Sequence, residues 1–386
     1  MQNTILVYWL YEITRDVWAI GKLGLFEAIP AITCSLFSGH FVESREKKKM
    51  LSICIGGYVI LSAGYVALSR AYSQGLVELS TTTHLVYAGF FINGVIRSFL
   101  SPTSFSILGL LVPRKLYPNA ATWSSTSWQS GGVLGPLAGG LLIAYLSVPS
   151  SLMFVTLVLL LAFVTILSIP KQPVIKKLKE PVLKSLREGM RFVFRTELIL
   201  AALTLDMFAV LFGGATALLP VFARDILQIG EVGYGWLRAA PGFGAIIMFF
   251  LLAWFPLRKS PGPKLMLSIA GYGLAIILFA LSRNPYLSFI LLLISGSLDA
   301  VSVVIRSTIL QLYTPDDMRG RVSAVNTMFI SSSNEIGEVE SGLAAKWMGT
   351  VPAVIFGGCM TLLVVAITWM KAPRLKTFKL ELEDKK

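Results

Sequence analysis

The sequence predicts an all-α membrane protein built from twelve spanning helices in two similar halves. Three observations support this fold class: an unusually apolar composition, an uneven distribution of lysine and arginine, and an internal repeat. Of the 386 residues, 55% are hydrophobic and only 14% are charged, whereas a soluble domain carries about 25% charged residues. One soluble core could not enclose so much apolar surface. Backbone polar groups in lipid must be bonded within the chain, so long apolar runs are expected to be helices.

Each spanning helix needs roughly 20 consecutive apolar residues, and the apolar runs of this chain supply twelve candidates. Polar or charged connections separate them, and most of these connections are short. The expected helices lie at residues 1–13, 19–42, 49–70, 84–112, 119–146, 150–170, 198–222, 233–256, 263–282, 286–313, 322–347 and 351–371.

Lysine and arginine are distributed unevenly between the two sets of loops. Twenty-five of them lie in alternate loops and the C-terminal tail, whereas the opposite loops hold five. Loops rich in these residues stay in the cytoplasm. We therefore expect a plasma (inner) membrane protein with both chain ends in the cytoplasm and an even helix count. The formal net charge of +13 then reflects contact with anionic lipid, and no nucleic acid partner is expected.

One long basic connection, residues 171–197, divides the helices into two groups of six. Leucine, methionine and phenylalanine recur at helical spacing between Leu183 and Arg195, which predicts an interfacial helix. The expected organisation is an N-terminal six-helix bundle at 1–170, the linker at 171–197, a C-terminal six-helix bundle at 198–371 and a charged cytoplasmic tail at 372–386.

Short motifs recur in the same order in the two halves. The matching segments include Arg15-Asp16 with Arg224-Asp225, Met50-Leu51-Ser52-Ile53 with Met266-Leu267-Ser268-Ile269, and Gly135 with Gly337. Two six-helix repeats are typical of secondary transporters, which handle their substrate near the midplane between the halves. By the same correspondence, Met1 matches a position well inside the seventh expected helix. The first helix is therefore expected to be truncated.

Several motifs of the second half are specific enough to indicate a family. They are Leu205-Asp206-Met207-Phe208, the segment from Leu218 to Asp225, Arg306-Ser307-Thr308, the segment from Pro315 to Val322 and the segment from Ser333 to Glu338. With these motifs the chain resembles the major facilitator superfamily, and within it the group of enterobactin, macrolide and siderophore efflux proteins. The resemblance implies a monomer that exports small amphiphilic compounds, siderophore-like or drug-like, in exchange for protons by alternating access.

The fifth expected helix carries a glycine pattern that the superfamily associates with antiporters. Gly131, Gly135, Pro136, Gly139 and Gly140 match G-x-x-x-G-P-x-x-G-G at every fixed position. Small residues let membrane helices approach closely, and a proline within a helix causes a bend. The pattern predicts a hinge or a closure contact, and tight packing without any role in transport is the alternative.

Two cytoplasmic loops correspond to gating loops of the superfamily. In the first, Gly39 and Glu43 fit the pattern, but Ser44 and Glu46 stand where the family has arginine and a second glycine. The lysines that follow would then only mark the cytoplasmic face. The second half contributes two further gating candidates from its Arg-Gly-Arg-Val motif. These are Arg319 and Arg321.

Ionisable residues inside the expected helices are the candidates for the mechanism. Each costs at least about 2.5–3.5 kcal/mol to place in the bilayer, so such side chains usually face the bundle interior. The candidates for proton coupling and for a charge network are Glu27, Arg97, Asp206, Asp299, Arg306, Glu335 and Glu338.

Arg97 and Asp299 occupy equivalent positions of the fourth and tenth expected helices, in opposite halves. Their opposite charges predict an attraction in one transport state and separation in another, with a static salt bridge as the alternative. Arg306 lies about two helical turns after Asp299 on the same face. There it could bind an anionic group of the substrate or keep Asp299 ionised.

Glu335 and Glu338 are three residues apart, so they share one face of the eleventh expected helix. Neighbouring carboxylates favour the protonation of one another, which suits a proton-binding site. A neutral, hydrogen-bonded and purely structural carboxyl group is the alternative at each position.

Other function classes find no support in the sequence. Only two histidines are present, and the three cysteines lie in apolar runs without metal-binding spacing. We therefore expect no catalytic residues, no metal, no cofactor and no enzymatic activity. No glycine pattern for nucleotide binding occurs, so the energy must come from an ion gradient. The alternatives are an uptake transporter or lipid flippase of the same fold, and a membrane sensor or enzyme that does not transport.

Overall fold

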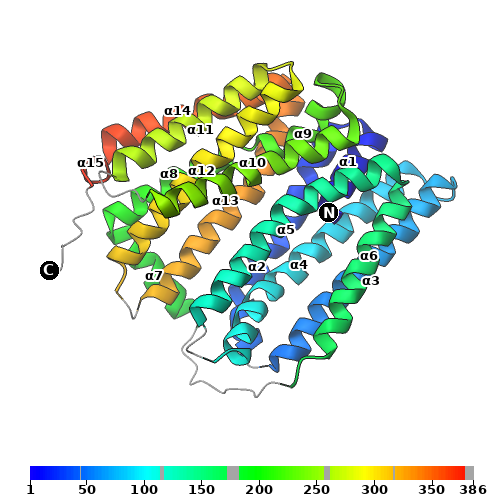
Figure 1. The fold of residues 1–386 in the computed structure, drawn as a ribbon, viewed down its shortest axis with the longest axis horizontal. Helices are drawn as coiled ribbons and strands as arrows, with labels where there is room; N and C mark the ends of the chain where they lie inside the picture. Colours follow the sequence, from blue (N-terminus) through cyan, green and yellow to red (C-terminus); the bar gives the residue numbers. More distant parts are fainter. Residues whose placement is uncertain (44, 114–116, 172–181, 256–260, 316–317, 379–386) are drawn as a thin grey trace. The chain divides into compact units, whose positions relative to one another are not determined.

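The structure is a computed structural model of the 386-residue chain. It describes all residues except 44, 114–116, 172–181, 256–260, 316–317 and 379–386. All regular secondary structure in the described ranges is helical (Figure 1). The prediction of an all-α protein is confirmed.

Residues Met1–Val182, together with Gly230–Gly235, form the first of two compact units. In this unit α2 packs along α4, and α3 packs against both α4 and α6. The helices are α1 (Gln2–Thr14), α2 (Val17–Glu43), α3 (Lys47–Ser73), α4 (Leu79–Leu111), α5 (Tyr117–Tyr145) and α6 (Val148–Leu167).

Residues Leu183–Ile229 and Trp236–Lys386 form the second unit. Here α11 packs against α12 and α14, and α8 packs against α13 and α14. The elements are α7 (Val182–Arg195), α8 (Glu197–Phe212), η2 (Ala215–Leu218), α9 (Leu219–Val221), η3 (Phe222–Ile226), α10 (Gly230–Trp254), α11 (Pro261–Leu281), α12 (Pro285–Tyr313), α13 (Arg319–Met348), α14 (Thr350–Lys371) and α15 (Pro373–Lys376).

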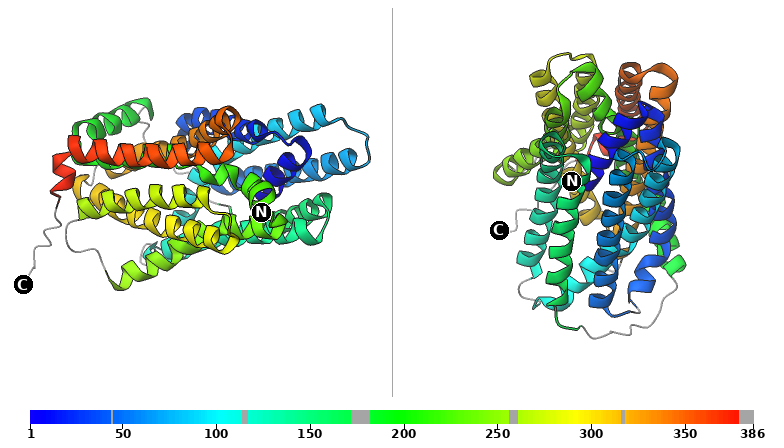
Figure 2. Two further views of the ribbon diagram at one scale, coloured as in Figure 1. Left: turned by 90° about the horizontal axis from the view of Figure 1, so that it is seen from above. Right: turned by 90° about the vertical axis from the view of Figure 1, so that its right-hand side faces the viewer.

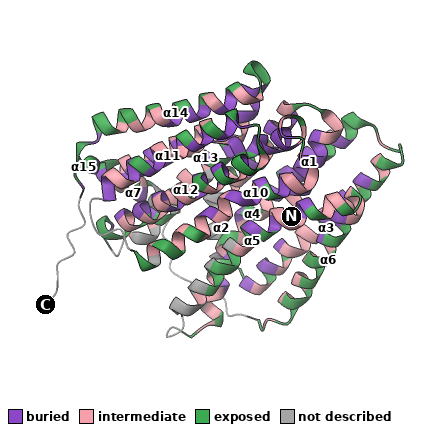
Figure 3. Cartoon of the chain, turned by 45° about the horizontal axis from the view of Figure 1, so that its top comes forward, coloured by how far each residue is buried: buried purple, intermediate pink, exposed green. Residues whose placement is uncertain are grey.

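The long helices are apolar enough to cross a membrane. Among the described residues, nine segments have the length and the low charge that a span requires. Exposed positions on these helices are often apolar: Leu157, Leu161 and Val164 of α6 are 53%, 67% and 53% exposed, and buried positions occur mainly where helices meet (Figure 3). Lipid around the helices accounts for this pattern, and the chain is a multi-pass membrane protein. The count of twelve spans stays a prediction, because α1, α5 and α13 are not among the nine.

The seventh expected helix, residues 198–222, is not continuous. α8 ends at Phe212, and the chain resumes as the 3-10 helix η2 and then as the π-helix η3. Gly213 and Gly214 lie at the interruption. The span expected at 198–222 agrees with the candidate span Glu197–Ile226, but its helix is interrupted because two consecutive glycines weaken helix formation.

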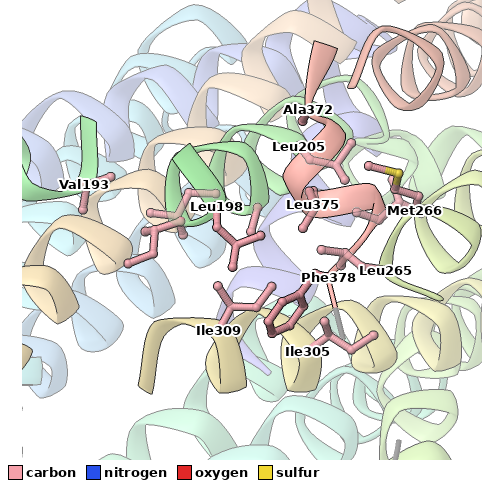
Figure 4. Close-up of a cluster of buried hydrophobic side chains, with 14 of the residues drawn as sticks. Val193, Leu198, Leu205, Leu265, Met266, Ile305, Ile309, Ala372, Leu375 and Phe378 are labelled. Atoms are coloured by element: carbon pink, nitrogen blue, oxygen red, sulfur yellow. The ribbon is translucent and has the colours of Figure 1, made fainter. Parts of the chain in front are cut away.

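Two segments outside the long helices pack against one end of the second unit. Val193 of α7 and Leu375 of α15 belong to one buried cluster with Leu198 and Leu265 (Figure 4). The cluster continues to Phe378. The first residues of the expected tail, which begins at 372, are therefore packed onto the bundle.

Candidate functional site

In the first unit, a buried carboxylate and an arginine form an ion pair between two spanning helices. Arg97 of α4 donates a hydrogen bond from Nη1 to Glu27 Oε1 of α2 at 2.9 Å. The Glu27 side chain is 7% exposed, whereas that of Arg97 is 46% exposed. The carboxylate is therefore enclosed by helices, while the guanidinium keeps an accessible side. A cation at this depth is costly against lipid, so the accessible side suits water or a polar ligand.

The close approach of α2 and α4 positions this pair. Gly94 lies almost one turn before Arg97, and a side chain at position 94 would collide with the backbone oxygen of Glu27. Two turns earlier on α4, Tyr87 donates to the backbone oxygen of Ala19 in α2 at 3.2 Å. The absence of a side chain at Gly94 thus lets α4 approach α2 until Arg97 reaches Glu27.

The expected partner of Arg97 was Asp299 in the opposite half. Arg97 instead bonds to Glu27 of its own unit. Asp299 lies half-buried on α12. An attraction between Arg97 and Asp299 would involve both units, and it stays a prediction.

The second unit contains a more deeply buried pair. Arg306 of α12 forms an ion pair with Asp206 of α8, and the two side chains are 6% and 7% exposed. Ser302, one turn before Arg306, donates to Asp206 Oδ1 at 3.3 Å. Both charged residues are candidates from the sequence, but Ser302 is not. The four-residue spacing of Ser302 and Arg306 places them on one helix face. This spacing reveals the role of Ser302 only when Asp206 is known to lie opposite that face.

The interruption after α8 lies between two neighbouring helices. A side chain on Gly213 would collide with the ring of Tyr272, whose hydroxyl donates to the Gly213 backbone oxygen at 2.9 Å. On another side, a Cβ added to Gly214 would lie 2.6 Å from Ser341 Oγ of α13. Irregular backbone at membrane depth is tolerated where protein neighbours bond to it, and interrupted helices form binding sites in secondary transporters. The Gly-Gly dipeptide is the sequence signal that could have identified this interruption.

α13 carries the acidic residues expected to bind protons. Glu335 is 4% exposed, and Glu338 is half-buried. Between them, Gly337 packs onto the end of α8, where an added Cβ would lie 2.8 Å from the Leu211 backbone oxygen. Along α13 the two glutamates therefore stand before and after the glycine that contacts α8, and their role in proton binding stays a prediction.

The antiporter pattern lies within α5, which continues past Pro136. Its glycines do not share one environment. Gly131 lies in open space, whereas Gly135 and Gly139 face α1. A Cβ added to Gly139 would lie 3.1 Å from Thr4 Cβ. The pattern is therefore a packing surface at some of its positions only.

Gly140 makes the tightest contact of this pattern. A Cβ added there would lie 2.7 Å from the Cα of Gly235 and 2.8 Å from the backbone oxygen of Glu231, both in the first two turns of α10. Tyr8 of α1 donates to Glu231 Oε1 at 3.3 Å, and its ring stacks on Tyr234 at 5.3 Å. The first two turns of α10 are thus held by both α5 and α1.

We expect Gly140→Ala to lower stability by about 1–3 kcal/mol, because the added methyl group meets backbone that cannot rotate away. The matched control is Gly131→Ala, which adds the same methyl group to the same motif in open space. That change is expected to be neutral or slightly stabilising, since alanine favours helix more than glycine does. Thermal unfolding of the two purified variants measures the difference. Equal melting temperatures would contradict the packing role of Gly140.

The loop between α2 and α3 is bonded to two helix ends. The surroundings of Gly39 and the side chain of Glu43 lie outside the described residues. Lys47 Nζ donates to the backbone oxygen of Val42 in α2. Lys48 Nζ donates at 2.8 Å to the backbone oxygen of Leu167, the last residue of α6. Lysine stabilises helix C-termini by bonding to unpaired carbonyls, so these two lysines have a structural role at the ends of α2 and α6.

The second gating candidate joins α13 to α7. Arg321 Nη1 lies 2.6 Å from Glu188 Oε2 of α7. A Cβ added to Gly189 would lie 2.8 Å from the Arg321 backbone oxygen. The side chain of Arg319 lies outside the described residues. The linker helix is therefore fixed to the start of α13 by backbone packing as well as by charge.

Two of the ion pairs described above, Glu27–Arg97 and Asp206–Arg306, each join two helices of one unit. The arginine in the first unit is accessible, whereas the pair in the second unit is enclosed. In the part of the chain that the structure describes, no group of three or more histidine, cysteine, aspartate or glutamate side chains is placed to hold a metal ion.

Comparison with known proteins identifies the family. The sequence model of the Major Facilitator Superfamily matches residues 2–338. The chain belongs to the major facilitator superfamily. Members of this superfamily are membrane transporters and not enzymes, and the same therefore holds for this protein.

Curated relatives and solved structures agree with this assignment. The chain is 26% identical to the enterobactin exporter EntS of Shigella flexneri over 366 residues, which cover 95% of this chain and 86% of that protein. It is 25% identical to EntS of Escherichia coli O1:K1 over the same shares. Among superfamily structures, the nucleoside transporter NupG matches with a TM-score of 0.72 and 14% identity, over 95% of this chain and 94% of that chain. A D-xylose-proton symporter matches with a TM-score of 0.74 and 14% identity, over 98% and 96%. These structures establish the fold.

Proposed function

We propose that this protein exports small amphiphilic compounds, siderophore-like or drug-like, in exchange for protons by alternating access. The observation that carries the proposal is the Glu27–Arg97 pair, in which an enclosed carboxylate is bonded to an arginine with 46% of its side chain exposed. Such a pair can respond to both a proton and a substrate.

The charge of Glu27 controls what Arg97 can bind. When Glu27 is ionised, the two charges neutralise each other and the arginine is held by its 2.9 Å hydrogen bond. While the pair is intact, the accessible side of the held guanidinium can bind electron-rich oxygens of a substrate. When Glu27 takes a proton, the ion pair is broken, the guanidinium is free to leave this position, and the substrate contact is lost. Loss of the proton restores the pair and the substrate-binding position. Proton binding and substrate release would then be coupled through one contact.

The remaining charged residues complete the proposed network. Asp206 and Arg306 are enclosed with Ser302, so we assign this pair to the integrity of the second unit. Asp299, Glu335 and Glu338 are the further carboxyl groups that could take a proton there. Arg97 and Asp299 are proposed to attract each other in one state of the cycle, which would draw the two units together.

The curated relatives support the proposed direction and location of transport. The two curated relatives cited above are named enterobactin exporters, which supports export of a siderophore-like compound. They also support location in a bacterial inner membrane. The lysine and arginine bias supports cytoplasmic chain ends, and the common behaviour of the superfamily supports a monomer.

The test is a transport assay in proteoliposomes with an imposed pH gradient and a panel of siderophores and amphiphilic drugs. We expect at least one compound to accumulate only when protons run down their gradient in the direction opposite to the compound. The internal pH should change as the compound moves. Collapsing the gradient with a protonophore should stop accumulation. A transport rate that is the same with and without the pH gradient would contradict proton coupling. Accumulation with protons moving in the same direction as the compound would indicate uptake.

A further inference from the structure

The linker helix α7 has a buried face that is bound to the second unit. Val193 is fully buried in the cluster that also contains Leu198 (Figure 4). Gly189 packs against the backbone of Arg321, and Glu188 adds the 2.6 Å ion pair with its side chain. The apolar side of α7 is therefore occupied by protein and is not available to lipid.

The opposite face of α7 is basic and exposed. Arg187, Arg191 and Arg195 follow one another at four-residue spacing, so they form one stripe along the helix. All three side chains are exposed, and Phe194 beside them is 57% exposed. These four residues are called the basic face of α7 below. On the helix they lie opposite Gly189 and Val193, so docking to the second unit leaves them outward.

Neighbouring residues indicate that α7 lies at the level of the membrane surface. Val193 shares its buried cluster with Leu375, which follows the end of the spanning helix α14. Near that end of α14, Lys376 Nζ lies 4.7 Å from the centre of the Trp369 ring, and tryptophan is typical of membrane–water interfaces. Figures 1 and 2 show α7 and α15 at the same end of the second unit. The lysine and arginine bias assigns this end to the cytoplasm.

We propose that the basic face of α7 binds the phosphate headgroups of anionic phospholipids in the cytoplasmic leaflet. The planar guanidinium group of arginine bonds to phosphate oxygens with two parallel donors, and the cytoplasmic surface of the membrane is negatively charged. Phe194 favours this partner over free phosphate or a soluble acidic protein, because an aromatic ring beside basic side chains can enter the boundary between headgroups and acyl chains. Since α7 is fixed to α13 through Arg321, the lipid contact anchors the second unit at the membrane surface.

The test compares lipid binding to the full-length purified protein and to a variant with Arg187→Gln, Arg191→Gln and Arg195→Gln. Native mass spectrometry measures how much phosphatidylglycerol or phosphatidylcholine stays bound at rising lipid concentration. A basic residue near an anionic surface contributes roughly fivefold to binding, so the triple variant should lose up to about 100-fold in affinity for phosphatidylglycerol. Binding of phosphatidylcholine should not change, and added salt should weaken the phosphatidylglycerol contact of the wild type. Millimolar inorganic phosphate should not displace the lipid.

The matched control removes the same charge elsewhere, with Arg70→Gln, Arg283→Gln and Lys346→Gln in the opposite set of loops. This control should keep the phosphatidylglycerol affinity of the wild type. A variant with lysine at positions 187, 191 and 195 keeps the charge and should retain most of the binding. It keeps the test decisive if the glutamine variant fails to fold. The proposal would be overturned if the glutamine variant and the control lost phosphatidylglycerol affinity equally, or if neither lost any.

Discussion

Glu27→Gln is expected to abolish accumulation driven by a pH gradient. Glutamine keeps an oxygen that can accept the hydrogen bond from Arg97, which is 2.9 Å long in the native pair, but it cannot take up or release a proton. The variant should therefore fold and bind substrate while losing coupling. Substrate exchange between two compartments at equal pH, which needs no net proton movement, should persist. Parallel proteoliposome assays with and without the gradient measure this difference.

The control for Glu27→Gln is Glu78→Gln. Glu78 is an exposed glutamate that precedes α4 and makes no side-chain capping bond, so its loss should leave both assays at the wild-type level. If Glu27→Gln still accumulates substrate against the gradient, the proton is carried elsewhere. Asp206, Asp299, Glu335 and Glu338 would then be replaced in turn. Transport that survives every single replacement would contradict coupling through carboxylates.

Asp206→Ala is expected to cause the largest loss of stability. The pair between Asp206 and Arg306 is nearly enclosed, with 7% and 6% of the side chains exposed. Removing one partner of a buried pair leaves an uncompensated charge, which typically costs about 3–5 kcal/mol. Ser302→Ala serves as the comparison, because it removes only one hydrogen bond, worth about 0.5–1.5 kcal/mol. Thermal unfolding in detergent should rank the melting temperatures as wild type, Ser302→Ala and then Asp206→Ala.

A double replacement separates charge from shape at this site. Replacing Asp206 by Leu and Arg306 by Met removes both charges and keeps apolar volume, so it should recover much of the stability that Asp206→Ala loses. Additive losses in the double variant would show that the two residues do not act as a pair. An Asp206→Ala variant that melts like the wild type would contradict the enclosed ion pair directly.

The antiporter pattern in α5 predicts close helix packing, but it does not show which of its glycines make the contacts. Five fixed positions identified the motif and predicted close helix packing, and the close approach of Gly140 to Gly235 agrees with that prediction. The same pattern gave Gly131 equal weight, although it lies in open space. The difference arises because each glycine points in its own direction around α5, and the sequence carries no information about which directions have neighbours.

The charged residues show the same limit. The cost of burying a charge in lipid is enough to mark Glu27, Arg97, Asp206 and Arg306 as important from their positions in apolar runs. Their partners were not readable, because helix packing brings together residues far apart in the chain. The sequence symmetry suggested Asp299 for Arg97, whereas α2 approaches α4 at Gly94 and supplies Glu27.

The sequence by itself determined that this is a helical membrane protein of the major facilitator superfamily. Apolar runs in lipid must satisfy their own backbone hydrogen bonds, which leaves the helix as the local structure, and the motifs identify the family. Only the tertiary structure decided which arginine meets which carboxylate, where the seventh helix breaks and which face of α7 remains exposed. These features depend on the rotation and the separation of packed helices. Both are set by contacts between side chains on different helices, and no local run of residues encodes them.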